Sequence, residues 1–135
     1  SGAPFTVIMT TNTTNAFTAG PLRPDIVGDA ALPSHERTLS RWFDTSAFRA
    51  PAAFAFGNSP RSSLRGGSLR TVDFTVTKEF AAVERVRFDL RAEAYNLFNS
   101  ASFDLPGHYL GAADFGVVNS ARPARAIQVG LRISY

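Results

Sequence analysis

The last nine residues of the chain, 127–135, alternate strictly between apolar and polar side chains. Because successive residues of a β-strand point to opposite faces, this alternation gives the segment one apolar face and one polar face. The apolar face carries Ile127, Val129, Leu131, Ile133 and Tyr135. The pattern predicts a strand that separates an apolar environment from a polar one.

The aromatic residue at the end of this strand indicates which apolar environment it meets. Tyr135 is the last residue and lies on the apolar face. A half-buried strand of a soluble protein can show the same alternation. The C-terminal strand of an outer-membrane β-barrel has in addition an aromatic side chain at the membrane boundary. We therefore expect lipid on the apolar face, with a soluble sheet as the alternative.

Two earlier segments show the same alternation. Val72, Phe74, Val76 and Phe80 share one face of the first, and Val86, Phe88, Leu90, Ala92 and Ala94 share one face of the second. We expect Val72–Phe80 and Val86–Phe98 to form an antiparallel hairpin with a tight turn at 81–85. Ile127–Tyr135 should pair antiparallel with Val86–Phe98, after a loop from about 99 to 125. Short turns at one end and long loops at the other are typical of outer-membrane barrels.

The first half of the chain has a different texture. Residues 11–70 are rich in Pro, Gly, Asn, Thr and Ser and show no sustained period of two or 3.6. Loops longer than about 15 residues are uncommon in compact domains. We predict an all-β chain organised as a single region, 1–135. Residues 1–10 would end a strand, 11–70 would form a long irregular loop, and 71–135 would form antiparallel strands of barrel type.

The charge distribution argues against nucleic acid as a partner. The net charge is +3, and Lys78 is the only lysine among the basic residues. The arginines are scattered through the expected loops or alternate with acids on the strands, which is typical of a solvated polar face. The chain has no cysteine, and no apolar run approaches the roughly 20 residues of a membrane helix.

Between the strands, short motifs occur in a recognisable order. They are Ser-Gly-Ala-Pro-Phe-Thr-Val at 1–7, Arg-Pro-Asp-Ile-Val-Gly-Asp at 23–29, Arg-Trp-Phe-Asp-Thr-Ser-Ala-Phe at 41–48, Gly57-Asn58 through Leu64-Arg65-Gly66, Arg-Ala-Glu-Ala-Tyr-Asn-Leu-Phe-Asn at 91–99, Phe115-Gly116 and the terminal strand. In this order and spacing they resemble the C-terminal end of TonB-dependent outer-membrane transporters, especially the group that begins with a carboxypeptidase-regulatory-like domain.

This resemblance implies a function and a set of partners. The chain would supply about three strands and the tip of a fourth to a barrel of about 22 strands. It would act in nutrient uptake across the outer membrane of a Gram-negative-type bacterium, without catalysis. Its partners would be outer-membrane lipid, the rest of the barrel with its plug, and the TonB energy-coupling system. Ser100-Ala101 departs from the family, in which His-Pro is common, and so does the final Tyr, where Phe is commoner.

A few strands alone would leave open edges, which hydrocarbon cannot satisfy. Self-association through these edges, or collapse of the loop over the apolar faces, is therefore an open alternative. A secreted or periplasmic β-sheet binding module, perhaps for carbohydrate, is the second functional alternative.

No catalytic, cofactor or metal site is expected. The chain lacks a Gly-x-Ser-x-Gly motif, and the adjacency of Ser34 and His35 does not establish a catalytic triad. His35 and His108 are isolated in sequence, whereas metal sites need several closely spaced ligands. We therefore predict no catalytic residue, no cofactor and no metal.

Four residues are candidate ligand or surface contacts. Trp42 and Phe43, with Phe48, could form a platform on which a sugar stacks, or could anchor the loop. Arg61 and Arg65 lie in the turn-rich stretch 57–67 and could bind an anion or, with Arg70, acidic lipid headgroups. That stretch lacks the Gly-Lys-Ser/Thr ending of a phosphate loop, so a simple connecting loop is the alternative.

Overall fold

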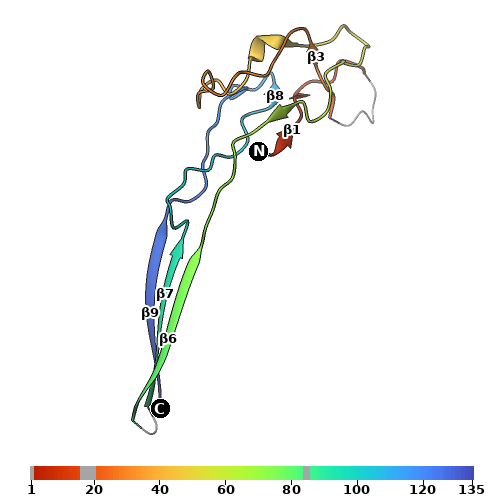
Figure 1. The fold of residues 1–135 in the computed structure, drawn as a ribbon. Coiled ribbons are helices and arrows are strands. Elements are labelled where there is room, and N and C mark those ends of the chain that lie inside the picture. The colour runs from red at the N-terminus through yellow and green to blue at the C-terminus, as the bar shows by residue number, and fades with distance from the viewer. Residues whose placement is uncertain (1, 16–20, 84–85) are drawn as a thin grey trace. The chain divides into compact units, whose positions relative to one another are not determined.

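The computed structural model describes residues 2–15, 21–83 and 86–135, which form two compact units. The loop unit comprises residues 1–69 and 103–121, and the sheet unit comprises residues 70–102 and 122–135. Apart from one short 3-10 helix, the regular elements of the described residues are all β-strands (Figure 1). The predicted all-β class is thus confirmed. No helix in the described ranges is long and apolar enough to cross a membrane.

The described part of the sheet unit contains three long strands. They are β6 (Phe74–Val83), β7 (Val86–Tyr95) and β9 (Ala126–Ser134), in the order β6-β7-β9 and antiparallel throughout (Figure 1). In the register, Phe80 lies opposite Phe88, and Phe88 lies opposite Ile133. The hairpin and the antiparallel pairing of the last strand are therefore confirmed, and the apolar residues of all three strands share one face.

The strand ends differ from the prediction by a few residues. Strand β7 stops at Tyr95 rather than Phe98, because Asn96 has a φ of 51° and leaves the extended conformation. Asn is one of the few residues that adopt this left-handed conformation readily. Strand β6 continues to Val83, with a shift of register between Ala81 and Val83. The part of the predicted turn at 81–83 therefore belongs to β6, and residues 84–85 lie outside the described residues.

Asn96 joins the loop-side ends of the sheet strands. Its backbone N–H donates to Oδ1 of Asp73, 2.9 Å away, just before β6 begins. Its side-chain Nδ2 donates to the carbonyls of Ser100 (3.2 Å) and Pro123 (3.4 Å), and its Oδ1 accepts the N–H of Ser100 (3.0 Å). Asn96 is 9% exposed. One small amide therefore ends β7 and holds the segments next to β6 and β9.

The loop unit is built from short elements that do not show in the sequence pattern. They are β1 (Pro4–Phe5), β2 (Ile8–Met9), β3 (Asp25–Ile26), η1 (Thr45–Ala47), β4 (Phe48–Arg49), β5 (Leu64–Arg65) and β8 (Tyr109–Leu110). Strand β1 pairs antiparallel with β5, β3 antiparallel with β4, and β2 parallel with β8. Residues 1–10, predicted as one strand end, thus carry two short strands.

An apolar core holds these short strands together. The buried cluster comprises Phe5, Val7, Ala30, Phe43, Ala47, Phe48 and Leu64. Phe43 is its centre, with ring centroids 5.8 Å from Phe5, 5.9 Å from Phe48 and 5.2 Å from Phe115. Aromatic pairs at such distances add about 0.5–1.5 kcal/mol each to their burial. Residues from both predicted loops, 11–70 and 99–125, therefore fold around one core.

Gly116 permits a close contact in this unit. Its φ is +83°, and a Cβ there would lie 2.6 Å from Cγ2 of Thr45. Its carbonyl accepts the N–H of Trp42 at 2.9 Å. A glycine is needed here because any larger residue would separate η1 from the 115–116 turn.

We predict that Asn96→Ala destabilises the protein by about 2–4 kcal/mol, since it removes three side-chain hydrogen bonds and places alanine in a left-handed conformation. Asn96→Gly should lose less, because glycine tolerates that conformation. Urea unfolding in detergent micelles measures both. Asn119→Ala, which removes one exposed hydrogen bond to Asp114, is the control and should change stability by less than about 0.5 kcal/mol. Equal stability of Asn96→Ala and wild type would contradict this role.

Candidate functional site

One face of the sheet is an exposed apolar surface, called here the apolar face. Along β9, exposure is 66% at Ile127, 68% at Val129, 58% at Leu131 and 54% at Ile133. The other strands add further apolar side chains, Phe74, Val76, Phe80, Phe88, Leu90, Ala92 and Ala94. Exposed apolar patches of this extent mark surfaces that contact protein or lipid.

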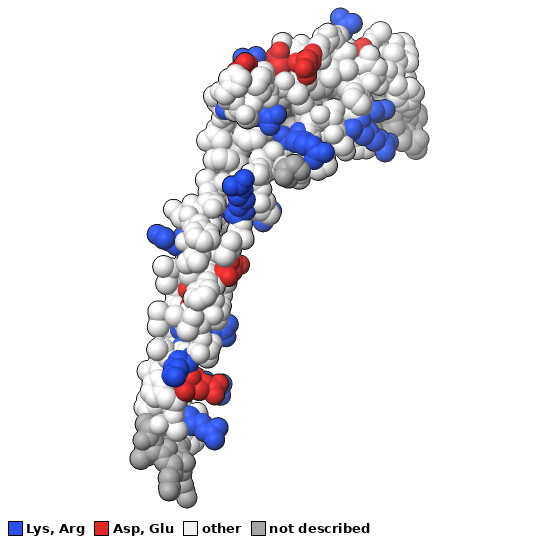
Figure 2. Space-filling model, viewed as in Figure 1, with Lys and Arg blue, Asp and Glu red and all other residues white. Residues whose placement is uncertain are grey.

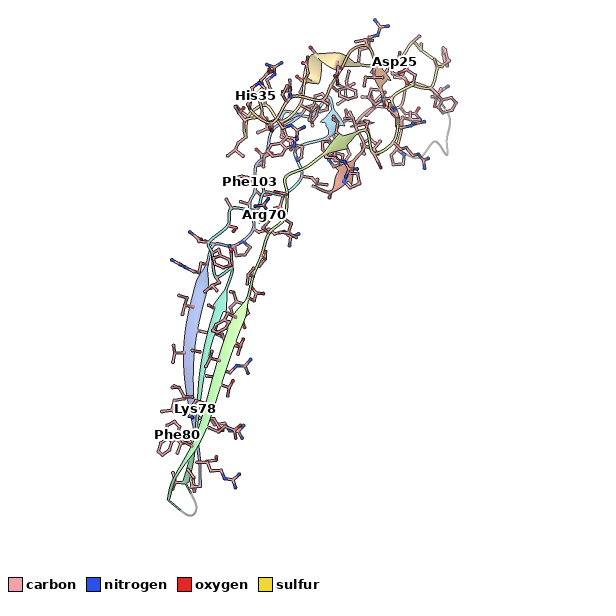
Figure 3. The ribbon with its side chains drawn as sticks, in the orientation of Figure 1. Asp25, His35, Arg70, Lys78, Phe80 and Phe103 are labelled. Atoms are coloured by element: carbon pink, nitrogen blue, oxygen red, sulfur yellow. The ribbon has the colours of Figure 1, made fainter. Side chains whose placement is uncertain are left out.

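Lys78 interrupts the apolar face. It lies on β6 near Phe80 (Figure 3). In the alternation it falls between Val76 and Phe80, and in the register it lies opposite Leu90. The rings of Phe80 and Phe88 stack one layer further along, with centroids 5.4 Å apart. A lysine in such a place keeps its stem on the apolar surface and its ammonium in a polar layer. Lys78 thus places a cation on the apolar face next to the aromatic layer of Phe80 and Phe88.

The opposite, polar face carries rows of charged side chains, called here the charged ladder (Figure 2). Its members are Glu79, Asp89, Arg91, Glu93 and Arg132. Glu93 is 8% exposed, and its carboxylate accepts hydrogen bonds from Arg91 on the same strand and from Gln128 on β9. A buried carboxylate is tolerated only when it is paired in this way. Next to it, a groove of about 370 Å³ is lined by Thr77, Glu79, Asp89, Arg91, Gly130, Leu131 and Arg132. This face suits water or a polar partner.

The loop unit contains a small cleft, called here the Arg–Trp cleft. Its volume is about 170 Å³, and its lining residues are Ala31, Leu32, Arg37, Trp42, Phe43, Ser63, Leu64 and Arg65. Trp42 donates its indole N–H to the carbonyl of Arg65 at 2.9 Å. The guanidinium carbon of Arg37 lies 5.9 Å from the centre of the Trp42 ring, in a cation–π arrangement.

The four candidate contact residues lie in different surroundings. Trp42, Phe43 and Arg65 all line the Arg–Trp cleft, although Phe43 is only 1% exposed and mainly anchors the core. Phe48 is also a core residue. Arg61 is exposed and does not line the cleft. The structure therefore brings together both predicted aromatics, Trp42 and Phe43, and one predicted arginine, Arg65, around a position that sequence reasoning missed.

That missed position is Arg37. It lies five residues before Trp42 in a segment with no periodicity, so no sequence signal placed its side chain beside the indole. The backbone at 37–42 turns back through the pairing of Thr38 with Arg41, which allows the contact. Arg41, the arginine next to Trp42 in the chain, pairs with Asp44 instead.

The two histidines make separate local contacts. His108 stacks on Tyr109, and the exposed His35 lies 3.6 Å from the carboxylate of Glu36. Within the described ranges, no group of three or more His, Asp or Glu side chains could hold a metal ion.

Asp44 caps η1 and is the titratable group of note beside the cleft. Hydrogen bonds from the Ser46 hydroxyl (2.8 Å) and N–H (3.1 Å) lower the pKa of the Asp44 carboxyl below its ordinary value, and Arg41 at 3.6 Å adds to the effect. Asp44 follows the core residue Phe43 and is the N-cap of η1. Because its ionised carboxylate accepts both hydrogen bonds from Ser46, it stabilises the start of this short helix.

Comparison with known proteins identifies the family of the chain. Residues 1–128 match the family model described as the outer membrane beta barrel domain. The chain belongs to the outer membrane β-barrel family. The search of curated proteins and the search of solved structures gave no match.

Membership of the outer membrane β-barrel family explains the two faces of the sheet. The protein is located in the outer membrane. Strands of such barrels alternate between a lipid-facing apolar side and a polar interior, with aromatic girdles at the membrane boundaries. The apolar face with Tyr135 and the ladder around Glu93 have these two characters.

We predict that acid weakens η1 through Asp44. Because the folded-state pKa is lowered, the ionised carboxylate stabilises the fold above the ordinary Asp pKa of about 3.9, and this contribution is lost as the pH falls through the lower folded value. Near-ultraviolet circular dichroism of Trp42 should therefore be constant from about pH 7 to 5 and change below about pH 4. Asp44→Asn should remove part of that change. A midpoint above about pH 5 that Asp44→Asn abolishes would contradict the prediction.

We predict that the adjacent positions 128 and 129 differ sharply in their tolerance of charge. Val129→Arg should cost about 2–4 kcal/mol on a lipid-facing strand. Gln128→Arg should cost far less, because its new cation lies beside the Glu93 carboxylate. Heat resistance in detergent micelles measures both variants. Similar losses from the two variants would show that the faces are assigned wrongly.

A second pair of changes distinguishes lipid from a packed protein interior, where the charged variants would rank the same way. Val129→Leu together with Ile133→Phe adds apolar bulk to the apolar face. Lipid yields around added atoms, whereas a close-packed core loses about 1–3 kcal/mol. The double variant should therefore keep the wild-type unfolding temperature in micelles, and a clear drop would refute lipid contact.

Proposed function

We propose that the chain is the C-terminal part of a TonB-dependent outer-membrane receptor that takes up a nutrient, with no catalytic step of its own. The observation that carries the barrel-wall part of this proposal is the three-stranded sheet with an unsealed edge on each side. Among the described residues, β6 and β9 pair only with β7. Their outer edges need partners in a membrane, since hydrocarbon cannot hydrogen-bond free N–H and C=O groups.

Further strands of the same protein are the partners that best fit these edges. The apolar face extends across all three strands, and its side chains along β9 are more than half exposed, as expected for a section of a barrel wall in lipid. Closure of the wall removes both edges at once. Self-association of several copies would satisfy the edges as well, and remains the alternative partner.

The polar face supports a filled lumen. Glu93, Arg91 and Gln128 form a hydrogen-bonded network there. Glu79, Asp89 and Arg132 share the next row of the register on the same face. Charges of both signs are suited to hydrogen-bonding a polar plug domain inside the barrel. We propose the plug as the partner of this face.

The choice of the TonB-dependent class rests on the ordered motifs. Three of them have structural roles that depend on the residue itself. Asn96 of the 91–99 motif ends β7, Gly116 permits the contact with η1, and Trp42 of the 41–48 motif spans to the Arg65 carbonyl. Residues with specific structural roles are less easily matched by chance. The ordered motifs therefore favour common descent with the TonB-dependent barrels over chance similarity.

The test compares three strains of the bacterium that carries the gene. One lacks the whole protein that contains this chain, one lacks the TonB energy-coupling protein, and one lacks both. Growth is measured on media in which iron, a vitamin or a carbohydrate is scarce. We expect the first strain to grow poorly when one nutrient is scarce, and the second strain to grow poorly on that nutrient and on others. On that nutrient, the strain with both deletions should grow no more slowly than either single deletion.

The control is the same gene restored with its TonB-binding segment deleted, while membrane insertion is checked by fractionation. Restoration of growth by this variant, or an uptake defect that is independent of TonB, would refute the energised-receptor function. Either result would leave the outer-membrane location unaffected.

A further inference from the structure

We propose that the Arg–Trp cleft binds the carboxylate or phosphate group of a small soluble ligand no larger than about one ring. The proposal deepens the proposed function by giving the receptor a substrate class. It rests on three observations about the cleft: a fixed guanidinium, an excess of positive charge, and a volume that limits the ligand.

The guanidinium of Arg37 is held in place before any ligand arrives. Its Nε donates to the carbonyl of Leu32 at 2.7 Å, and its carbon lies over the Trp42 ring. Trp42 is itself fixed by its hydrogen bond to the Arg65 carbonyl. A side chain fixed in this way loses little conformational entropy on binding, so its donors are preorganised.

The remaining donors of Arg37 are suited to an oxyanion. Guanidinium has five N–H groups in a fixed fork, and the bond to Leu32 uses the Nε donor. The Nη donors can form parallel hydrogen bonds to two oxygens of a carboxylate or phosphate. Arg37 is half-buried, which strengthens such bonds by partly excluding water.

Among the described residues, no carboxylate balances the positive charge of the cleft. No acidic residue lines it, and in the part of the chain that the structure describes neither Arg37 nor Arg65 has a carboxylate oxygen within 4.0 Å. The nearby Asp44 pairs with Arg41 instead. Both arginines bring positive charge to the cleft, which a bound anion would balance.

Arg65 supplies an adjustable second contact. Its side chain is exposed, and its Nη1 donates to the Gly2 carbonyl at 3.3 Å, a long hydrogen bond. A long and exposed bond is easily exchanged for one to a charged ligand, which is shorter and stronger. Arg65 can therefore close on an anion that Arg37 positions.

The size and lining of the cleft restrict the ligand. Its volume of about 170 Å³ is close to the ~150 Å³ of a cavity that holds a benzene ring. Leu32, Phe43 and Leu64 provide apolar walls, and Ser63 provides a hydroxyl. An acidic sugar, or another acidic compound of one ring, fits this combination.

The test is calorimetric titration of the intact protein that contains the chain, in a non-ionic detergent without sugar. The probes are galacturonate, glucose 6-phosphate and neutral galactose. We expect saturable binding of at least one of the two anions, no binding of galactose, and affinity that falls as salt is added.

The variants assign the binding to the cleft. Arg37→Gln should weaken anion binding about tenfold or more, and Arg65→Gln by several-fold. Arg37→Lys keeps the charge but loses the planar fork, so it should bind more weakly than wild type. The matched control is Arg49→Gln, which removes an equal charge at an exposed position of β4 outside the cleft and should bind as wild type does.

Several results would overturn the inference. They are absence of anion binding by the wild type, equal binding of galactose, or equal weakening by Arg49→Gln. Binding of phosphatidylglycerol in mixed micelles, without binding of the soluble anions, would overturn the assignment to a soluble ligand. The titration requires no energy coupling, so its outcome is separate from that of the strain comparison that tests TonB-dependent uptake.

Discussion

The pairing of backbone groups along β7 is the interaction on which the sheet depends. Among the described strands, β7 alone is hydrogen-bonded on both sides, to β6 and to β9. In a membrane, no water is present to replace a lost bond, so this strand must stay in register over its full length. Asn96 sets where the register ends, because its amide joins the strand end to the segments at Asp73 and Pro123. Asn96 therefore fixes the end of the strand pairing at the side of the sheet where β7 ends.

The loop unit obeys a different rule from the sheet unit. The sheet exposes its apolar residues, with Val129 at 68%, whereas the loop unit buries Phe43 to 1%. The same chain thus contains an exposed apolar surface, which suits lipid, and a buried apolar core, which is typical of a unit surrounded by water. The outer membrane requires both, since a barrel wall meets lipid while its connecting loops meet an aqueous phase.

The sheet could be predicted from the sequence, and the loop unit could not. Alternation along 72–80, 86–94 and 127–135 is a local signal, because the side-chain direction of a strand repeats every two residues. The core around Phe43 brings together residues from Phe5 to Phe115 through two-residue strands, which are too short to show a period. The same limit applies to the Arg–Trp cleft. Trp42 and Arg65 could be singled out by residue type, but Arg37 joins them only through a turn of the backbone.

Lys78 has a consequence for how the wall sits in the bilayer. A primary amine on the apolar face cannot descend far into hydrocarbon, so the bilayer surface on that side has to lie within reach of its four-carbon stem. The stacked Phe80 and Phe88 rings lie on the same face and favour the same interfacial layer. A cation beside two aromatic rings favours the membrane–water interface, so this layer opposes vertical sliding of β6 and β7 through the bilayer.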